Sequence, residues 1–309
     1  MKKRRGSFIM SMCLVCTVFV MDAAAQSGTL QKKIVINWTE GLVRNVITVP
    51  LDLDAMPFPR ARREAEMAVT QAAPELFLSS MQNVLYDSSH TVGEYIASLP
   101  GSGDRKILLN ELSILSTKGR ITTSVVSEDY RFLEITFEYT LYGSGGLYAL
   151  FLRHTEMAPL EEQFGYYPGR KYSGIVIYAK EPLAAFGRND KKLFAPSLFP
   201  KIQMLTSANF NIQDEYIKLL FAPYMGNPEA IAAWGCVGYS YSTDENVYLE
   251  RVGKFPLRII AYGIYGKNNT DLIIPEESAR QILSQKENMD LLRQGRVMVV
   301  MSDPDFPQE

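Results

Sequence analysis

The chain has little of what most catalytic sites are built from. Only two histidines and three cysteines occur among 309 residues, so sites that need several imidazole or thiolate ligands are excluded by supply. The formal net charge is −2, which excludes the basic surface of a typical nucleic-acid-binding protein. The sequence contains no Gly-x-Ser-x-Gly elbow, Walker loop or dinucleotide fingerprint. Internal repeats, heptads and low-complexity tracts are absent as well.

The first 25 residues have the pattern of an export signal. Four basic residues, Lys2 to Arg5, precede an apolar run from Phe8 to Met21 and the small residues Ala23-Ala24-Ala25. The apolar run is shorter than the roughly 20 residues that span a bilayer. An uncleaved membrane anchor is the alternative interpretation. We predict a signal peptide over residues 1–25 and a periplasmic location for the mature chain, in proximity to the outer membrane or cell wall.

Cleavage after Ala25 would leave Cys236 as the only cysteine of the mature chain. One cysteine cannot form an internal disulfide, even in an oxidising compartment. Cys236 lies in the apolar stretch 232–237, which favours a buried small side chain over a reactive thiol. The mature fold must therefore be stabilised by its hydrophobic core.

The sequence pattern of the N-terminal half predicts strands followed by one long helix. Residues 33–38 and 42–49 are strand-like, and a helical pattern begins at Arg60. Small residues recur along one face of that helix, where they would let it lie close to a sheet: Ala61, Ala65, Ala68 and Ala72. Pro74 is expected to kink the helix or to start a new first turn.

After a turn at residues 100–103 the sequence becomes rich in strands. Residues 121–126 and 132–142 are the clearest, and the second alternates polar with apolar side chains as in an antiparallel sheet. Further strands are expected in the second half, and one helix is expected between Pro275 and Gly295. The ranges of these strands are 173–179, 198–204, 231–241, 247–263 and 297–301.

These elements predict an α+β fold with antiparallel sheets, one long N-terminal helix and one C-terminal helix. A polar stretch rich in proline and glycine, residues 157–170, looks like a junction between two domains. The predicted organisation is an N-terminal α+β domain over residues 26–156 and a β-rich α+β domain over residues 171–309.

No group of residues assembles a nucleophile, a base and an orienting partner. His90 lies in a polar turn and His154 at the end of an expected strand, positions typical of surface or capping histidines. Acidic pairs could hold calcium or act as acid and base, but none has the spacing of a calcium loop, so we interpret them as solvated. These pairs are Asp52 with Asp54, Glu161 with Glu162, and Asp303 with Asp305. We predict no enzyme activity, no cofactor and no metal.

Two kinds of binding residue are candidates instead. The pair Tyr166 and Tyr167 could line a groove for a sugar or a partner, although aromatic packing in a core explains most tyrosines. Strand residues would pair with a neighbouring chain if their strands lie at the edge of a sheet. These candidates are Ile34, Val35 and Ile36 near the N-terminus, and Val297 and Val299 near the C-terminus.

Several blocks of sequence together form a recognisable pattern. In the first half these are the alanine-ridged helix from Ala61, the step Thr91-Val92-Gly93-Glu94-Tyr95 and the strands at 121–128 and 133–137. The second half adds YSGIVIYAK from Tyr172, APSLFPKI from Ala195, TDLIIPEESARQIL from Thr270 and LLRQGRVMVVM from Leu291. These blocks resemble the FlgP-like outer-membrane and flagellar accessory family. Residues 186–195 and 206–228 look like additions to that pattern and are candidate sites for partners.

The resemblance implies a structural role. FlgP-like proteins build or decorate rings and disks around flagellar motors, or lie at the outer membrane. An unlipidated periplasmic chain of this kind is expected to form a homo-oligomer with protein partners in a ring or collar. The alternative is an envelope module that binds peptidoglycan or a polysaccharide through Tyr166, Tyr167 and the acidic pairs.

Overall fold

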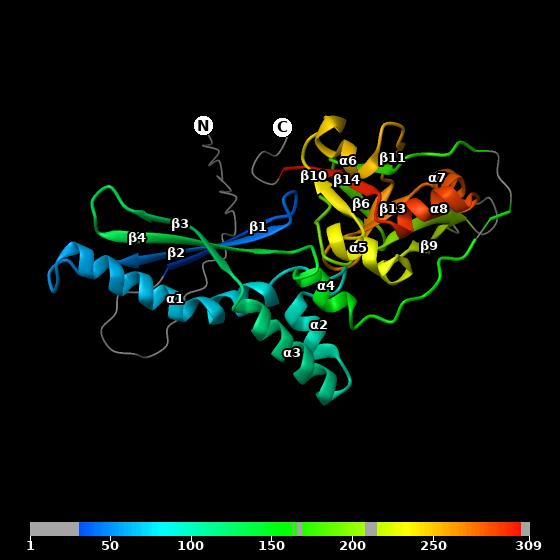
Figure 1. Cartoon of the computed structure of the whole chain (residues 1–309). Helices are drawn as coiled ribbons and strands as arrows, with labels where there is room; N and C mark the ends of the chain where they lie inside the picture. Colours follow the sequence, from blue (N-terminus) through cyan, green and yellow to red (C-terminus); the bar gives the residue numbers. More distant parts are fainter. Residues whose placement is uncertain (1–30, 163, 166–168, 208–214, 304–309) are drawn as a thin grey trace, which may run out of the picture.

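The computed structural model describes residues 31–162, 164–165, 169–207 and 215–303. In this part of the chain, eight α-helices accompany three β-sheets. The N-terminal sheet and helix α1 (Phe58–Gln82) lie side by side, away from the sheets of the C-terminal half (Figure 1). The fold is therefore a mixture of α and β elements with both antiparallel and parallel strand pairs.

The N-terminal sheet is antiparallel throughout, as the alternating sequence predicts, and has the strand order β1-β2-β4-β3. Every second residue of β2 and β4 is buried, because directly opposite residues such as Val43 and Tyr139 share one face of the sheet. The other face carries polar side chains such as Arg44 and Glu134 together with a few apolar ones, among them Val35 and Val125. The strands are β1 (Gln31–Asn37), β2 (Leu42–Pro50), β3 (Arg120–Val126) and β4 (Phe132–Thr140).

Helix α1 covers the buried face of this sheet. The buried apolar residues are spaced by four, and the largest of them lie at the C-terminal end of the helix: Ala61, Ala65, Val69, Ala73, Phe77 and Met81. Ser80 is buried as well. Ala68 and Ala72, which were expected on this ridge, are exposed and half-buried. Pro74 lies inside α1 and does not divide it into two helices.

The expectation of one long N-terminal helix is not borne out, because three more helices follow α1 before residue 157. They are α2 (Val92–Ser98), α3 (Ser102–Ser116) and α4 (Leu147–Leu152). Helix α3 buries Leu108, Leu112 and Leu115, a helical spacing that the reading of this region as strand-rich missed. The apolar run of α4 is buried at all six positions.

The C-terminal half is not purely antiparallel. One sheet, β10-β14-β5-β11, is parallel throughout, and the other, β7-β6-β12-β13-β8-β9, is mixed. The central strand β14 is an unbroken apolar run buried at every position, which is typical of a parallel strand covered on both faces. The bounds are β5 (Ile175–Ala179), β6 (Leu183–Ala185), β7 (Lys191–Lys192), β8 (Ile202–Ser207), β9 (Glu215–Phe221), β10 (Gly238–Ser240), β11 (Leu257–Ile260), β12 (Gly263–Tyr265), β13 (Asp271–Ile274) and β14 (Val297–Met301).

Helices connect the parallel strands and replace parts of the expected strands. Residues 231–241 form the end of α5 (Pro228–Trp234) and then β10, and residues 247–263 include η3 (Glu245–Tyr248) and α6 (Leu249–Val252). A short 3-10 helix, η2 (Pro223–Met225), precedes α5. The single C-terminal helix is instead two helices, α7 (Glu276–Leu283) and α8 (Lys286–Arg293).

One hydrophobic core runs through both halves. Tyr148 of α4 stacks on Phe199 with ring centroids 4.6 Å apart, and Trp38 packs edge-on against Tyr239 at 5.6 Å. Met157 and Leu160, in the predicted junction, also pack against this core. The two halves are therefore in extensive contact.

Candidate functional site

The N-terminal sheet is open at both of its edges. In the described part of the chain, no strand pairs with the outer edge of β1 or of β3. Ile34 and Ile36 of β1 lie opposite the buried Asn45 and Val43, so they point toward the α1 side of the sheet and are half-buried. Val35 lies on the other face and is 37% exposed. The first strand thus offers a free backbone edge together with one exposed apolar side chain.

The C-terminal candidates Val297 and Val299 lie elsewhere. Both are fully buried in β14, which pairs with β10 on one side and β5 on the other. No edge remains there for another chain, so these residues belong to the core. Tyr166 and Tyr167 lie outside the described residues.

Lys32 of β1 forms a hydrogen bond with α1. Its ammonium group donates a hydrogen bond of 2.5 Å to the carbonyl of Leu76, and burial lowers the pKa of Lys32 to about 8. The edge strand is therefore held on its inner face by a lysine as well as by apolar contacts, and its outer edge is left free.

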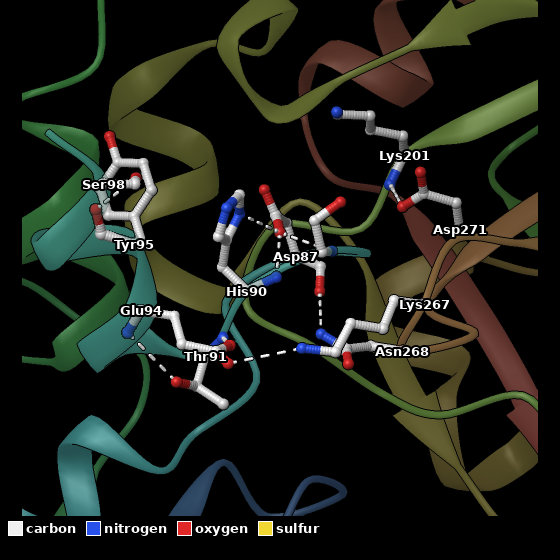
Figure 2. Close-up of polar contacts among 11 residues, drawn as sticks. Asp87, His90, Thr91, Glu94, Tyr95, Ser98, Lys201, Lys267, Asn268 and Asp271 are labelled. Carbon is white, nitrogen blue, oxygen red and sulfur yellow. Dashed lines mark hydrogen bonds and ion pairs between the residues drawn. The ribbon is translucent and has the colours of Figure 1, made fainter.

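A polar turn after α1 joins the N-terminal sheet to the C-terminal half (Figure 2). Asp87 organises the turn, because its Oδ1 accepts hydrogen bonds from the backbone N–H groups of Ser89 and His90, each at 2.8 Å. The Nδ1 atom of His90 lies 3.1 Å from the same oxygen. Thr91 and Glu94 then form a reciprocal cap at the start of α2.

The segment before β13 reaches back to this turn. The backbone N–H of Asn268 donates to the carbonyl of Ser88 at 3.0 Å, and its side-chain amide donates to the carbonyl of Asp87 at 3.1 Å. Lys267 adds an ion pair with Glu94 at 3.4 Å. These contacts fix the position of the C-terminal half relative to α2.

Asp271 lies behind this turn and is 1% exposed. Burial raises the pKa of Asp271, although hydrogen bonds from the backbone of Lys201 and from the side chains of Ser88 and Gln203 act in the opposite direction. The carboxylate of Asp271 is thus held by hydrogen bonds from three residues, Lys201, Ser88 and Gln203. Figure 2 shows Asp271 together with the turn residues Asp87 and Asn268, and we call these contacts between the turn after α1 and the C-terminal half the joint.

The remaining chemical candidates belong to separate segments of the chain. His154 follows α4, not a strand, and its Nε2 lies 3.3 Å from Glu111. Asp52, Asp54, Glu161 and Glu162 are exposed, Asp303 is half-buried, and Asp305 lies outside the described residues. No group of three or more potential metal ligands occurs among the described residues. Cys236 is buried as expected, and burial raises the pKa of its thiol to about 11, which keeps the thiol protonated at neutral pH.

The residues of the joint were not identified from the sequence, apart from the turn that contains His90. The available signal was the segment Gly266-Lys267-Asn268-Asn269, because glycine and asparagine tolerate positive φ angles. Gly266 has φ 91° and Asn269 has φ 57°. This pattern predicts a tight turn, but it does not show what the turn contacts.

Comparison with known proteins finds two matches in consecutive parts of the chain. Residues 29–144 match the model of the N-terminal domain of Treponema pallidum Tp0624, and residues 174–303 match the model of its second domain. The chain is similar to two domains of Tp0624. The Tp0624-like N-terminal region contains β1 to β4, and the Tp0624-like second region contains β5 to β14.

Residues between the two Tp0624-like regions include α4 and the predicted junction 157–170. The descriptions of both matches name domains and no activity. No curated protein sequence matches the chain. Among the described residues, no helix is both long enough and apolar enough to cross a membrane.

Proposed function

We propose that the protein is a non-catalytic structural component of an exported assembly in the cell envelope. The observation that supports this proposal is the N-terminal sheet with two unpaired edges, β1 and β3. Free backbone N–H and C=O groups at a sheet edge can pair with another strand and so extend the sheet into a neighbouring molecule.

Copies join in a head-to-tail arrangement, with β1 of one copy beside β3 of the next. A contact between two different surfaces closes into a ring when the rotation between copies permits it. Such a ring fits the resemblance to FlgP-like proteins, and we propose a periplasmic ring or collar of the flagellar motor as the assembly. Lys33 on β1 and the irregular pairing at Ile121 and Thr123 of β3 are features that limit indiscriminate pairing of edges.

Cross-linking between the two edges tests this arrangement. The variant with Val35→Cys and Val125→Cys places one exposed thiol on each edge strand, and the buried Cys236 is protected. A short bismaleimide reagent is expected to produce a ladder of oligomers from the double variant and no ladder from either single variant. Monomers alone from the double variant would contradict head-to-tail pairing.

Electron cryo-tomography of the flagellar motor tests the proposed location. Deletion of the gene is expected to remove a periplasmic ring or collar density that wild-type cells show. Unchanged motors together with normal swimming would contradict the flagellar assignment and leave the pairing of edges to be explained by another envelope assembly.

A further inference from the structure

A groove lies between the end of α3 and the glycine-rich loop that precedes α4. It consists of two adjoining cavities of about 120 Å³ and about 220 Å³, which share Leu115, Lys118 and Gly145. The first cavity extends to Arg153 and the second to Arg120. An added Cβ at Gly145 would meet no atom within 4 Å, so the loop leaves open space on that side.

Apolar side chains form part of the lining of the groove. Leu115 is buried beneath both cavities, Leu150 contributes to one cavity, and Leu42 with Tyr139 contributes to the other. Ile114 lines the first cavity and is 52% exposed, although it belongs to a helix that is packed on its other side. A partner that fills this groove would remove an exposed isoleucine from water, which favours binding.

Two cations beside the groove, Lys118 and Arg120, make no ion pair in the described part of the chain, although Glu138 lies opposite Arg120 across the β3–β4 pair. Glu138 lines the groove, but it pairs with Arg44, and hydrogen bonding to Glu138 raises the pKa of that arginine. Glu111 pairs with Arg153 at 3.2 Å. Within the described ranges, Lys118 and Arg120 make no ion pair, so the groove keeps an excess of positive charge.

We propose that this groove binds an acidic segment of a partner protein that also carries apolar side chains. Positive charge at the rim complements carboxylates, and the leucine-lined interior complements apolar side chains. The two small cavities adjoin one another between Arg153 and Arg120, so an extended segment suits the groove better than one compact organic ligand. The inference goes beyond the proposed edge pairing and names the chemistry of a second partner.

Fluorescence anisotropy with two labelled peptides tests the proposal. In the first peptide glutamate alternates with leucine, and in the second glutamine replaces each glutamate. The acidic peptide is expected to bind at low salt at least about tenfold more tightly than the glutamine peptide, and added salt is expected to weaken its binding. Equal binding of the two peptides, or no binding of the acidic one, would overturn the proposal.

The double variant Lys118→Gln, Arg120→Gln should reduce affinity for the acidic peptide about tenfold or more. Arg131→Gln is the matched control, because Arg131 is an exposed arginine at the far end of the β3–β4 hairpin, and it should leave affinity unchanged. Unchanged affinity in the double variant would overturn the assignment of the groove. Circular dichroism establishes that the variants are folded.

The same titration on the Val35→Lys variant separates the groove from edge pairing. Peptide affinity is expected to be unchanged there, because Val35 does not line the groove. Failure of self-association with intact peptide binding would contradict only the proposed assembly, whereas self-association without peptide binding would contradict only the groove.

Discussion

The side-chain amide of Asn268 donates a hydrogen bond of 3.1 Å to the main-chain carbonyl of Asp87, across 181 residues of sequence. Together with the backbone hydrogen bond from Asn268 to Ser88, it ties the C-terminal half to the turn after α1. The hydrophobic core is also continuous across this boundary. The two regions that match separate domain models are therefore expected to unfold as one cooperative unit.

The two tryptophans provide a test of this cooperativity, since Trp38 lies in the N-terminal region and Trp234 at the end of α5. In urea, the two single-tryptophan variants are expected to unfold with the same midpoint. In the same experiment, Asn268→Ala is expected to lower the free energy of unfolding by about 1 kcal/mol, because it removes the hydrogen bond to Asp87. Asn189→Ala, in an exposed turn, serves as the control and should have little effect. Separate midpoints for the two tryptophans would show that the halves unfold independently.

The effect of replacing Asp271 on stability should depend on the new side chain. The Ala variant leaves the Lys201 N–H and the Gln203 amide without their acceptor and is expected to lose about 1–3 kcal/mol. The Asn variant removes a buried charge and keeps one acceptor oxygen for the Lys201 N–H, and the Gln203 amide can turn over so that its oxygen accepts from the new NH2 group. At pH 7 this variant should therefore be at least as stable as wild type.

The pH dependence of that comparison follows from the raised pKa of Asp271. The folded state keeps its proton to a higher pH than the unfolded state, so the aspartate costs stability as pH rises through this range. The advantage of Asp271→Asn should therefore shrink as pH falls and Asp271 becomes protonated. Thermal unfolding of both proteins from acidic to neutral pH measures the difference in their stability. A stability gain of Asp271→Asn that grows as pH falls would contradict this account.

At alkaline pH, Lys32 should change the free energy of unfolding with pH in the opposite direction to Asp271. Its pKa is about 8 in the folded state and about 10.4 in an unfolded chain. Between these values the unfolded state binds more protons, so the contribution of Lys32 to the free energy of unfolding rises with pH. Lys32→Met removes this contribution, and the stability of the variant relative to wild type should fall between about pH 8 and pH 10.

Chemical denaturation of both proteins across this range tests the prediction. The difference between the two proteins cancels the effects of the buried tyrosines and of Cys236, whose raised pKa values act in the same pH range. A difference that does not change with pH would mean that Lys32 is not buried under α1.

Close packing at Gly174 predicts a large effect of a single methyl group. A Cβ there would lie 2.4 Å from the Cα atom of Val252, so β5 and α6 would have to move apart. Gly174→Ala is expected to cost about 3 kcal/mol. Gly103→Ala is the control, because no atom lies within 4 Å of a Cβ at that position in α3 and alanine favours a helix. Differential scanning calorimetry compares the two, and equal melting temperatures would contradict the described packing.

The sequence predicted the N-terminal sheet well because its signal is local. Alternation along residues 132–140 and the helical pattern from Arg60 each report one buried face. The pattern of small residues alone predicted the wrong residues for the buried face of α1. Val69 and Ala73 are buried there, and the neighbouring Ala68 and Ala72 are not. The spacing of large apolar residues such as Phe77 and Met81 would have located the face correctly.

Parallel pairing in the C-terminal half was missed for a physical reason. An apolar run such as Val297–Met301 fits a buried strand in either direction, and only its neighbours decide between them. The same limit applies to the candidate surfaces. Edge position is a property of the sheet, so the sequence could nominate Val35 and Val299 equally, and the strand order places only Val35 at an edge.

Sedimentation velocity of the chain without residues 1–25 tests the central claim most directly. Wild type is expected to form oligomers as concentration rises, whereas Val35→Lys and Val125→Lys, which place a charge at each edge, should remain monomeric. Val247→Lys, at an exposed valine of η3 in the C-terminal half, should assemble like wild type. A wild-type protein that stays monomeric at high concentration, or edge variants that assemble like it, would contradict assembly through the open sheet.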